Sequence, residues 1–299
     1  LKRSNREHKS EQEPLDTVMP MVVLTDENTA SASEITAGSL QDLDRAVVMG
    51  TKTYGKGLVQ TMVDLPYNAQ MKLTTNKYYI PSGRCIQKVT YRHGNGGSAE
   101  AVADSVVEGF HTANGRPVKG GGGIEPEVVV KPDSLPNITY YLAAMRDSDE
   151  LVHTFEIDYI AKHPTIAPAS EFALTDADYE EFKQRVLNSH FKYDAMSAKS
   201  LDDLEKLAKF EGYYDDAKAE FDALRKKLKP NLAKDLDFNK ESICEILNND
   251  IVAAYYYQRG AVQNTLRTDK QVKAAFDLLA DAERYQQLLK PQPKDKAKN

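Results

Sequence analysis

Long apolar runs and blocks of positive charge are both missing from this chain of 299 residues. No window approaches the roughly 20 consecutive apolar residues that span a bilayer, and no charged start followed by an apolar stretch resembles a signal peptide. The 39 basic and 45 acidic residues give a formal net charge of -6, without a cationic block that could neutralise a row of phosphates. We therefore expect a soluble chain that does not bind nucleic acid.

Cysteine and histidine are also scarce, with two and six residues. Cys85 and Cys244 alone cannot supply a zinc site, and they lie so far apart in the sequence that we do not expect a disulfide between them. None of the six histidines has a spacing that marks it as a catalytic base or a metal ligand. The sequence predicts neither a metal nor another cofactor.

The order of the expected elements divides the chain into three parts. Residues 1–19 begin with Leu and are polar and basic, and we interpret them as a leader that continues from a missing N-terminal part. Residues 20–132 hold short β-rich runs separated by turn residues, with one helical stretch from Ser33 to Leu43, an order typical of α/β proteins. Residues 133–299 carry apolar residues three and four apart, which predicts an all-α C-terminal domain with a disordered tail.

Two smaller features refine these expectations. The segment AVADSVVEGFHTANGRP, residues 101–117, begins with a helical pattern and continues as a loop. In the C-terminal domain, Thr175 with Asp178 and Ser200 with Asp203 have the spacing of helix caps. We therefore expect a helix to start at each of these pairs.

The stretch TASASEI, residues 29–35, places Ser31 and Glu34 in S-x-x-E spacing. This is the spacing of a capping box, in which the hydroxyl accepts from an early backbone amide and the acid accepts from the amide of the cap. A serine at a sharp strand-to-helix turn has a second use, because its hydroxyl projects beyond the strand and the following amides point at the group it attacks. The two interpretations are not exclusive.

A serine nucleophile needs a base to take its proton, and the candidate is Lys56. It lies between Gly55 and Gly57 in TKTYGKGLVQT, and Gln60 follows four residues later. A lysine can act as a base when burial favours its neutral amine. On spacing alone a lysine between two glycines, just ahead of a strand, is more often a turn residue.

The stretch ENTASASEITAGSLQDLDRAVVMGTKTYGKGLVQT closely resembles the active-site region of the C-terminal processing peptidases, also called tail-specific proteases. The resemblance covers roughly residues 20–132. In that family a Ser/Lys dyad cleaves peptide bonds, so the resemblance implies Ser31 as nucleophile, Lys56 as base and Gln60 as the residue that orients the amine. Tyr54 stands where the family usually has Phe.

Further roles also follow from this resemblance. The backbone amide of Ala32 would be one oxyanion donor, and Glu34 a possible supporting acid whose role is less certain. The implied fold is a crotonase-like α/β protease core, of which residues 20–132 are the C-terminal half. The implied function is a serine endopeptidase that cleaves protein substrates near their C-termini through an acyl-enzyme, in the periplasm or another exported location. By analogy alone, we also expect a homo-oligomer assembled through the helical domain.

One part of the family pattern is absent. In the family a glycine-rich turn upstream of the serine gives a second oxyanion donor, and a PDZ domain lies farther upstream, but this chain has no glycine before Gly38. We interpret the chain as a fragment that is weakly active by itself. Two alternatives stay open: a non-catalytic binding or scaffold module that retains the protease fold, and a Ser/Lys hydrolase of other amides or esters.

Overall fold

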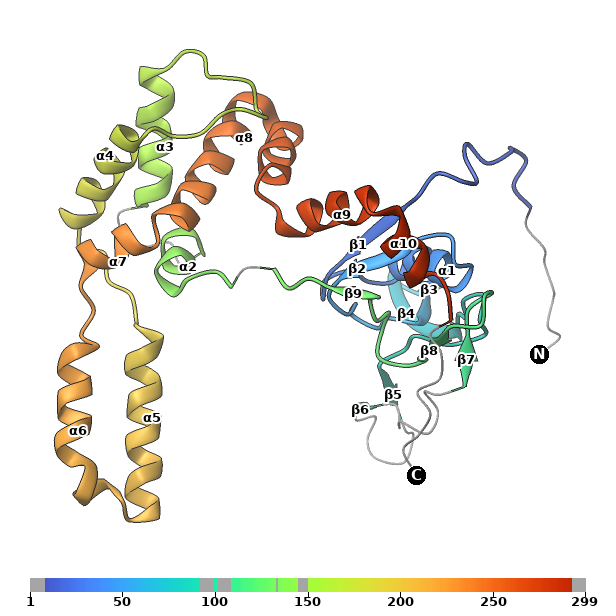
Figure 1. The fold of residues 1–299 in the computed structure, drawn as a ribbon, viewed down its shortest axis with the longest axis horizontal. Helices are drawn as coiled ribbons and strands as arrows, with labels where there is room; N and C mark the ends of the chain where they lie inside the picture. The colour runs from blue at the N-terminus through green and yellow to red at the C-terminus, as the bar shows by residue number, and fades with distance from the viewer. Residues whose placement is uncertain (1–8, 92–98, 102–108, 133, 145–149, 292–299) are drawn as a thin grey trace. The chain divides into compact units, whose positions relative to one another are not determined.

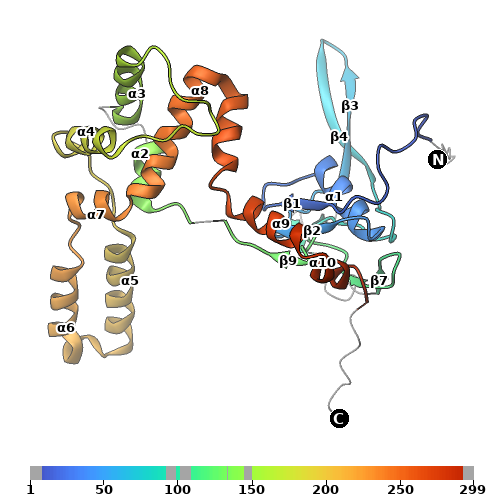
Figure 2. The ribbon, with the colours of Figure 1, turned by 45° about the horizontal axis from the view of Figure 1, so that its top comes forward.

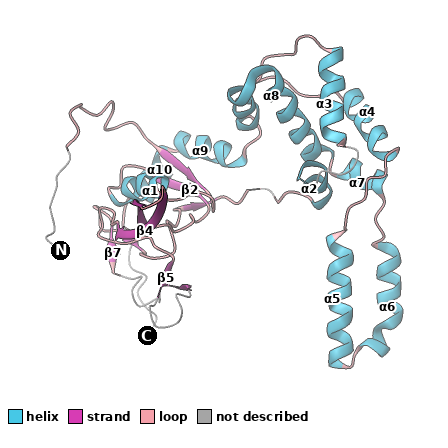
Figure 3. Cartoon of the chain, turned by 180° about the vertical axis from the view of Figure 1, so that it is seen from behind, coloured by secondary structure: helices cyan, strands magenta, loops and turns pink. Residues whose placement is uncertain are grey.

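The computed structural model describes residues 9–91, 99–101, 109–132, 134–144 and 150–291. The chain divides into two compact units (Figure 1), the first formed by Leu1–Pro132 with Lys270–Asn299 and the second by Asp133–Asp269. Within the described ranges, all strands belong to the first unit and the second is helical (Figure 3). The α/β part followed by a helical part is therefore confirmed. None of the described helices is long and apolar enough to cross a membrane.

A parallel sheet forms the centre of the first unit. Its strands are β1 (Val22–Thr25), β2 (Val47–Gly50) and β9 (Val128–Val129), in the order β1-β2-β9. All four residues of β2 are buried, as expected for the central strand of a parallel sheet that is covered on both faces. Helix α1 (Ala32–Asp42) connects β1 to β2, so the predicted strand–helix–strand order is confirmed.

Different elements cover the two faces of the sheet. On one face Val48 packs with Ile80, Ile86 and Ile124, and α1 approaches this layer so closely that a Cβ on Gly38 would lie 2.7 Å from Cδ1 of Ile124. The other face is covered by α9 (Lys270–Ala280) and α10 (Ala282–Leu288) (Figure 1). The apolar contacts there join Val47 and Met49 to Ala275, Leu278, Tyr285 and Leu289.

The position of α9 and α10 differs from the expected domain boundary. The sequence placed residues 133–299 in one helical domain, but residues 270–291 pack on the sheet of the first unit. The Tyr285 hydroxyl also contacts the backbone of Met21, with 2.9 Å to its N and to its O. The reason for the error is physical: helical periodicity shows that a helix has an apolar face, but not which apolar surface that face covers.

Three antiparallel hairpins complete the first unit. The longest, β3 (Leu58–Leu65) with β4 (Ala69–Lys77), projects from the sheet region (Figure 2), and β5 (Val89–Tyr91) pairs with β6 (Ala99–Ala101). The last hairpin joins β7 (Phe110–His111) to β8 (Pro117–Val118). The helical pattern expected from residue 101 is wrong at Ala101, which ends a strand, and its continuation over residues 102–108 lies outside the described residues.

The second unit contains α2 to α8. Their bounds are α2 (Asn137–Ala144), α3 (Leu151–Lys162), α4 (Asp176–Leu187), α5 (Met196–Glu211), α6 (Tyr214–Lys227), α7 (Leu232–Phe238) and α8 (Lys240–Leu266). The core of this unit contains Phe155, Tyr179, Phe182 and Leu247. The capping box of Thr175 and Asp178 at the start of α4 is confirmed. The second expected cap is wrong, because α5 begins at Met196 and Ser200 lies inside it.

Candidate active site

Ser31 lies at the turn between β1 and α1 with an unusual backbone conformation. It is the N-cap of α1, with φ 57° and ψ -116°. A residue other than glycine rarely adopts positive φ, and this backbone conformation costs of order 1–3 kcal/mol. A strained strand-to-helix turn also exposes the serine nucleophile of the α/β-hydrolases. The backbone at Ser31 is therefore more strained than a helix cap requires.

Ala32 follows as the first residue of α1. Its N–H cannot take part in the hydrogen-bond ladder of the helix, because the first turn of a helix has no upstream carbonyls. Among the residues that the structure describes, no acceptor binds this N–H. A free amide at the start of a helix favours a nearby negative charge. Ala32 is thus placed to donate to an oxyanion formed at Ser31.

Glu34 is a fully buried carboxylate that accepts four hydrogen bonds. Its Oε1 accepts from Thr53 Oγ1 at 2.5 Å and from the Gly55 N–H at 2.7 Å. Its Oε2 accepts from the N–H groups of Ser31 and Lys56, both at 2.8 Å. The capping box is therefore present, but the acid does more than cap the helix. It joins the Ser31 turn to the Lys56 loop, whose backbones lie within about two hydrogen-bond lengths of each other.

The two glycines beside Lys56 are required by close packing. Gly55 has φ 88°, and a Cβ there would lie 2.8 Å from Cβ of Lys88. A Cβ on Gly57 would lie 2.8 Å from the backbone N of Gln87, whose side-chain Oε1 accepts the Gly57 N–H at 2.7 Å. The glycines thus let the loop pass close to Gln87 and Lys88, and they fix where the Lys56 backbone lies.

Tyr78 is a site residue whose role the sequence did not reveal. Its hydroxyl donates to the carbonyl of Lys56 and lies 3.3 Å from the carbonyl of Ser31. Burial, together with the charge of Glu34, raises the pKa of Tyr78 to about 12, so the hydroxyl stays a donor. The ring packs against the layer that contains Val48. The sequence offered no signal for the contact of its hydroxyl with the site.

A cavity of about 670 Å³ opens beside this site. It is lined by Asn28, Ala30, Tyr54, Gly55, Lys56, Leu58, Gln60, Gln87, Lys88 and Val89. The structure thus brings Lys56 and Gln60 to one cavity, and Ser31 directly follows Ala30 in its wall. The Lys56 side chain is exposed, and within the described part of the chain its ammonium has no hydrogen-bond partner.

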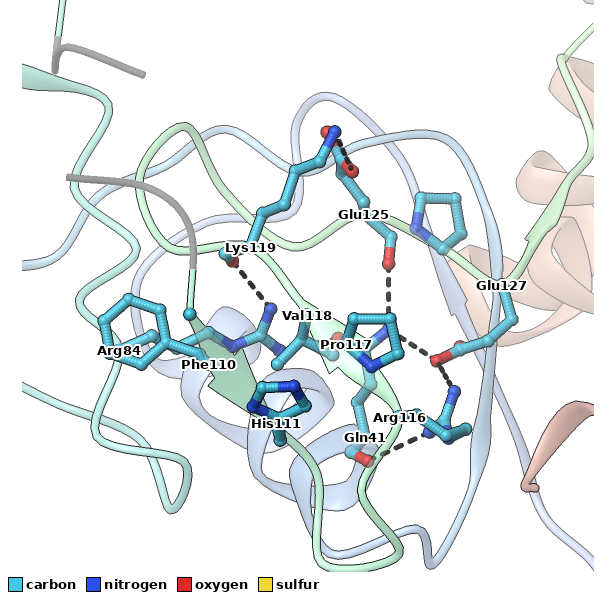
Figure 4. Close-up of a pocket in the computed structure, with 12 residues that line it drawn as sticks. Gln41, Arg84, Phe110, His111, Arg116, Pro117, Val118, Lys119, Glu125 and Glu127 are labelled. Atoms are coloured by element: carbon cyan, nitrogen blue, oxygen red, sulfur yellow. Dashed lines mark hydrogen bonds and ion pairs between the residues drawn. The ribbon is translucent and has the colours of Figure 1, made fainter. Parts of the chain in front are cut away.

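A second cavity, of about 550 Å³, lies at the other end of α1 (Figure 4). Buried ion pairs surround it: Arg84 contacts Asp42 at 2.8 Å, and Arg116 contacts Asp44 and Glu127, both at 2.6 Å. Ten residues of helix separate Ser31 from this end, or about 15 Å. These ion pairs hold the C-terminal end of α1 and do not reach the Ser31 turn.

Two parts of the chain match known protein families. Residues 1–94 match peptidase family S41, and residues 138–279 match a family described as "Probable PDZ-protease, C-terminal helical domain". The first match includes the Ser31 turn, the Lys56 loop and Tyr78. The resemblance of this region to the C-terminal processing peptidases is confirmed by the match of residues 1–94.

Individual relatives are C-terminal processing enzymes. A carboxy-terminal-processing protease of Bartonella bacilliformis is 51% identical over 70 residues, 23% of this chain and 16% of that protein. A carboxyl-terminal-processing protease of Picosynechococcus is 51% identical over 73 residues, 24% and 18% of the two chains. The chloroplastic C-terminal processing peptidase of Tetradesmus obliquus is 44% identical over 75 residues, 25% and 16%.

These matches span less than a fifth of each relative. Among solved structures, the photosystem II D1 C-terminal processing protease is 32% identical, and the match covers 40% of this chain and 23% of that one with a TM-score of 0.28.

Proposed function

We propose that this chain is part of a serine endopeptidase that cleaves protein substrates near their C-termini. Ser31 is the nucleophile, Lys56 the general base and Gln60 the residue that orients the lysine amine. The observation that carries the proposal is the buried Glu34, which binds the Ser31 turn and the Lys56 loop through one carboxylate oxygen. A helix cap needs only the first of these bonds, so the second supports a working pair.

In the proposed reaction the neutral amine of Lys56 takes the proton of the Ser31 hydroxyl, and the Ser31 oxygen attacks the substrate carbonyl. The free N–H of Ala32 binds the oxyanion, and such a donor contributes on the order of 3 kcal/mol. The leaving amine takes the proton, and water then hydrolyses the acyl-enzyme. Glu34 is a positioning residue, because it binds three backbone N–H groups and the Thr53 hydroxyl and not the substrate.

The proposed base needs a dry environment, because desolvation favours the neutral amine of a lysine. Lys56 is exposed in the described structure. It lines the cavity of about 670 Å³, and we place the substrate chain in that cavity. A substrate bound there would cover the Lys56 amine, so the base would become active only when the site is filled.

The proposal includes the compartment and the larger fold. The relatives are bacterial and chloroplastic processing proteases, which supports an exported location such as the periplasm. A crotonase-like core completed by polypeptide outside this chain agrees with the exposed β3–β4 hairpin, since an isolated two-stranded hairpin is at best marginally stable.

The test is cleavage of an unstructured protein with an apolar C-terminus by the full-length parent protein. Mass spectrometry of the products shows whether the cuts lie near the C-terminus. Ser31→Ala and Lys56→Ala should each abolish cleavage without changing the circular dichroism spectrum. Lys52→Ala is the matched control, because Lys52 is an exposed lysine of the same loop that pairs with Glu125.

Three outcomes would reject the proposal. Cleavage by Ser31→Ala at the parental rate would show that Ser31 is not the nucleophile. If Lys52→Ala lost as much cleavage activity as Lys56→Ala, the effect would not be specific to Lys56. An inert parent would favour the alternative of a binding module that retains the protease fold. The exposed Lys56 ammonium is the observation that favours this alternative.

A further inference from the structure

Helices α5 and α6 form a hairpin in the second unit that packs mainly on itself (Figures 1 and 3). Its own core is small, with Leu201, Ala208 and Phe221 buried and Tyr214 and Ala217 partly buried beside them. The ion pairs of Arg225 with Asp202 and Glu205 close the seam between the two helices. Two helices with so few buried side chains gain little stability from their own packing.

Three leucines beside this seam are left uncovered. Leu204 is 53% exposed, Leu207 50% and Leu224 45%. Leu204 lies three residues after the seam residue Leu201, and Leu224 lies three residues after the seam residue Phe221. Residues at this spacing are neighbours on a helix surface, so both leucines lie beside the seam. The hairpin therefore presents an apolar strip that the described residues of its own unit do not cover.

The charges of α6 are segregated along its length. Asp215, Asp216, Glu220 and Asp222 lie in its first part, whereas Arg225, Lys226 and Lys227 form its last turn. Lys218 is the one basic residue of the first part. Apart from Arg225, none of these side chains has an ion pair within the described residues. A helix with this pattern is complementary to an antiparallel copy of itself.

We propose that the α5–α6 hairpin is a self-association surface that binds the same hairpin of a second copy of this chain. Two hairpins related by a two-fold axis form an antiparallel four-helix arrangement, an isologous interface. With the axis beside Leu224, the two copies of that leucine meet, and Glu220 of each copy faces Lys227 of the other. Glu220, Leu224 and Lys227 lie along one side of α6 because they are four and three residues apart.

The available area is adequate for such a contact. A helix of 16 residues, the length of α5, is about 24 Å long, and two helices side by side are about 20 Å wide. Two such faces bury on the order of 1,000 Å², the lower end of specific protein interfaces. The dimer should therefore be reversible and depend on protein concentration. This inference is independent of the peptidase assignment.

Sedimentation equilibrium of the 299-residue chain across the micromolar range tests the surface. The chain should dimerise, and Glu220→Lys should weaken the dimer because it places a lysine opposite Lys227 at two symmetric positions. We expect the dissociation constant to rise about tenfold, because two symmetric attractive pairs between exposed side chains become repulsive. Lys227→Glu should act similarly, and the double variant Glu220→Lys/Lys227→Glu should restore the parental value.

The matched control is Asp222→Lys, which makes the same change of charge on the other side of α6. It should leave the dissociation constant unchanged. A chain that stays monomeric at all concentrations overturns the proposal. So does a dimer that responds equally to Asp222→Lys, or one that the double charge exchange fails to restore. Because all these side chains are exposed, unfolding does not confuse the result, and circular dichroism checks this.

Discussion

Replacing Glu34 by Gln isolates the role of the buried carboxylate. The substitution keeps the shape of the side chain but turns one acceptor oxygen into an NH₂ group. If the NH₂ group replaces Oε1, it faces the N–H of Gly55. If it replaces Oε2, it faces the N–H groups of Ser31 and Lys56. In either case at least one backbone N–H loses its acceptor. The variant therefore loses charge-assisted bonds and leaves a buried donor without a partner.

The expected loss follows from these bonds. A hydrogen bond to a charged group contributes about 1.5–3 kcal/mol, and an unsatisfied buried donor costs about 1–3 kcal/mol. The loss of one such bond together with one unsatisfied donor lowers the free energy of unfolding of the first unit by about 2.5–6 kcal/mol. Activity of the parent protein should fall as well, because the Ser31 turn and the Lys56 loop would no longer share an acceptor.

Urea-dependent proteolysis, followed by mass spectrometry of the peptides from residues 22–91, measures the first unit without interference from the second. Glu27→Gln is the matched control, because Glu27 is an exposed acid just before the same turn. We expect that control to change the stability by less than about 0.5 kcal/mol. A Glu34→Gln effect as small as the control would refute the structural role assigned to the carboxylate.

Three further predictions use other observations. The free energy of unfolding of Ser31→Gly should be about 1–2 kcal/mol larger than that of Ser31→Ala, because glycine adopts φ 57° without strain. Equal urea midpoints for the two variants would show that the backbone at Ser31 is not strained. Burial and the charge of Glu156, opposed by His153, raise the pKa of Asp250, so the native state keeps a proton that the unfolded chain releases. The contribution of Asp250 to the free energy of unfolding should fall as the pH rises above 3.8, the ordinary pKa of an aspartate. In urea titrations at neutral pH, Asp250→Asn should therefore be more stable than the parent. Burial raises the pKa of Cys244 to about 11, so iodoacetamide should alkylate it slowly at neutral pH and faster in alkali; rapid alkylation at neutral pH would contradict this.

The sequence predicted the local structure around Ser31 and Lys56 better than the contacts that join them. The S-x-x-E spacing predicted a helix cap at Ser31, and the structure has a capping box with a strained serine. The glycines around Lys56 indicated a tight loop, which the contacts with Gln87 and Lys88 explain. The catalytic roles of Ser31, Lys56 and Gln60 stay a proposal, because they depend on a reaction and not on the fold.

Contacts between residues far apart in the chain could not be predicted in this way. The pairing of Glu34 with Thr53 and Gly55 joins positions about twenty residues apart, and no local pattern encodes it. The hydroxyl of Tyr78 reaches the site only because its ring packs in the layer beneath. In the same way, the periodicity of residues 270–291 gave helices but not the sheet face that they cover.

The two roles that TASASEI allows for Ser31, helix cap and nucleophile, differ in what they require of Glu34. A cap needs one acceptor for the first amides of a helix, and an exposed acid would be sufficient. Here the acid is buried and also holds the Lys56 loop, although burying a carboxylate without a counter-ion is costly unless its oxygens are saturated. The four donors offset that cost because they saturate the carboxylate oxygens, and they also hold the two loops together. The shared carboxylate holds the backbone of the Ser31 turn beside that of the Lys56 loop, which is more than a helix cap needs and supports the proposed Ser/Lys pair.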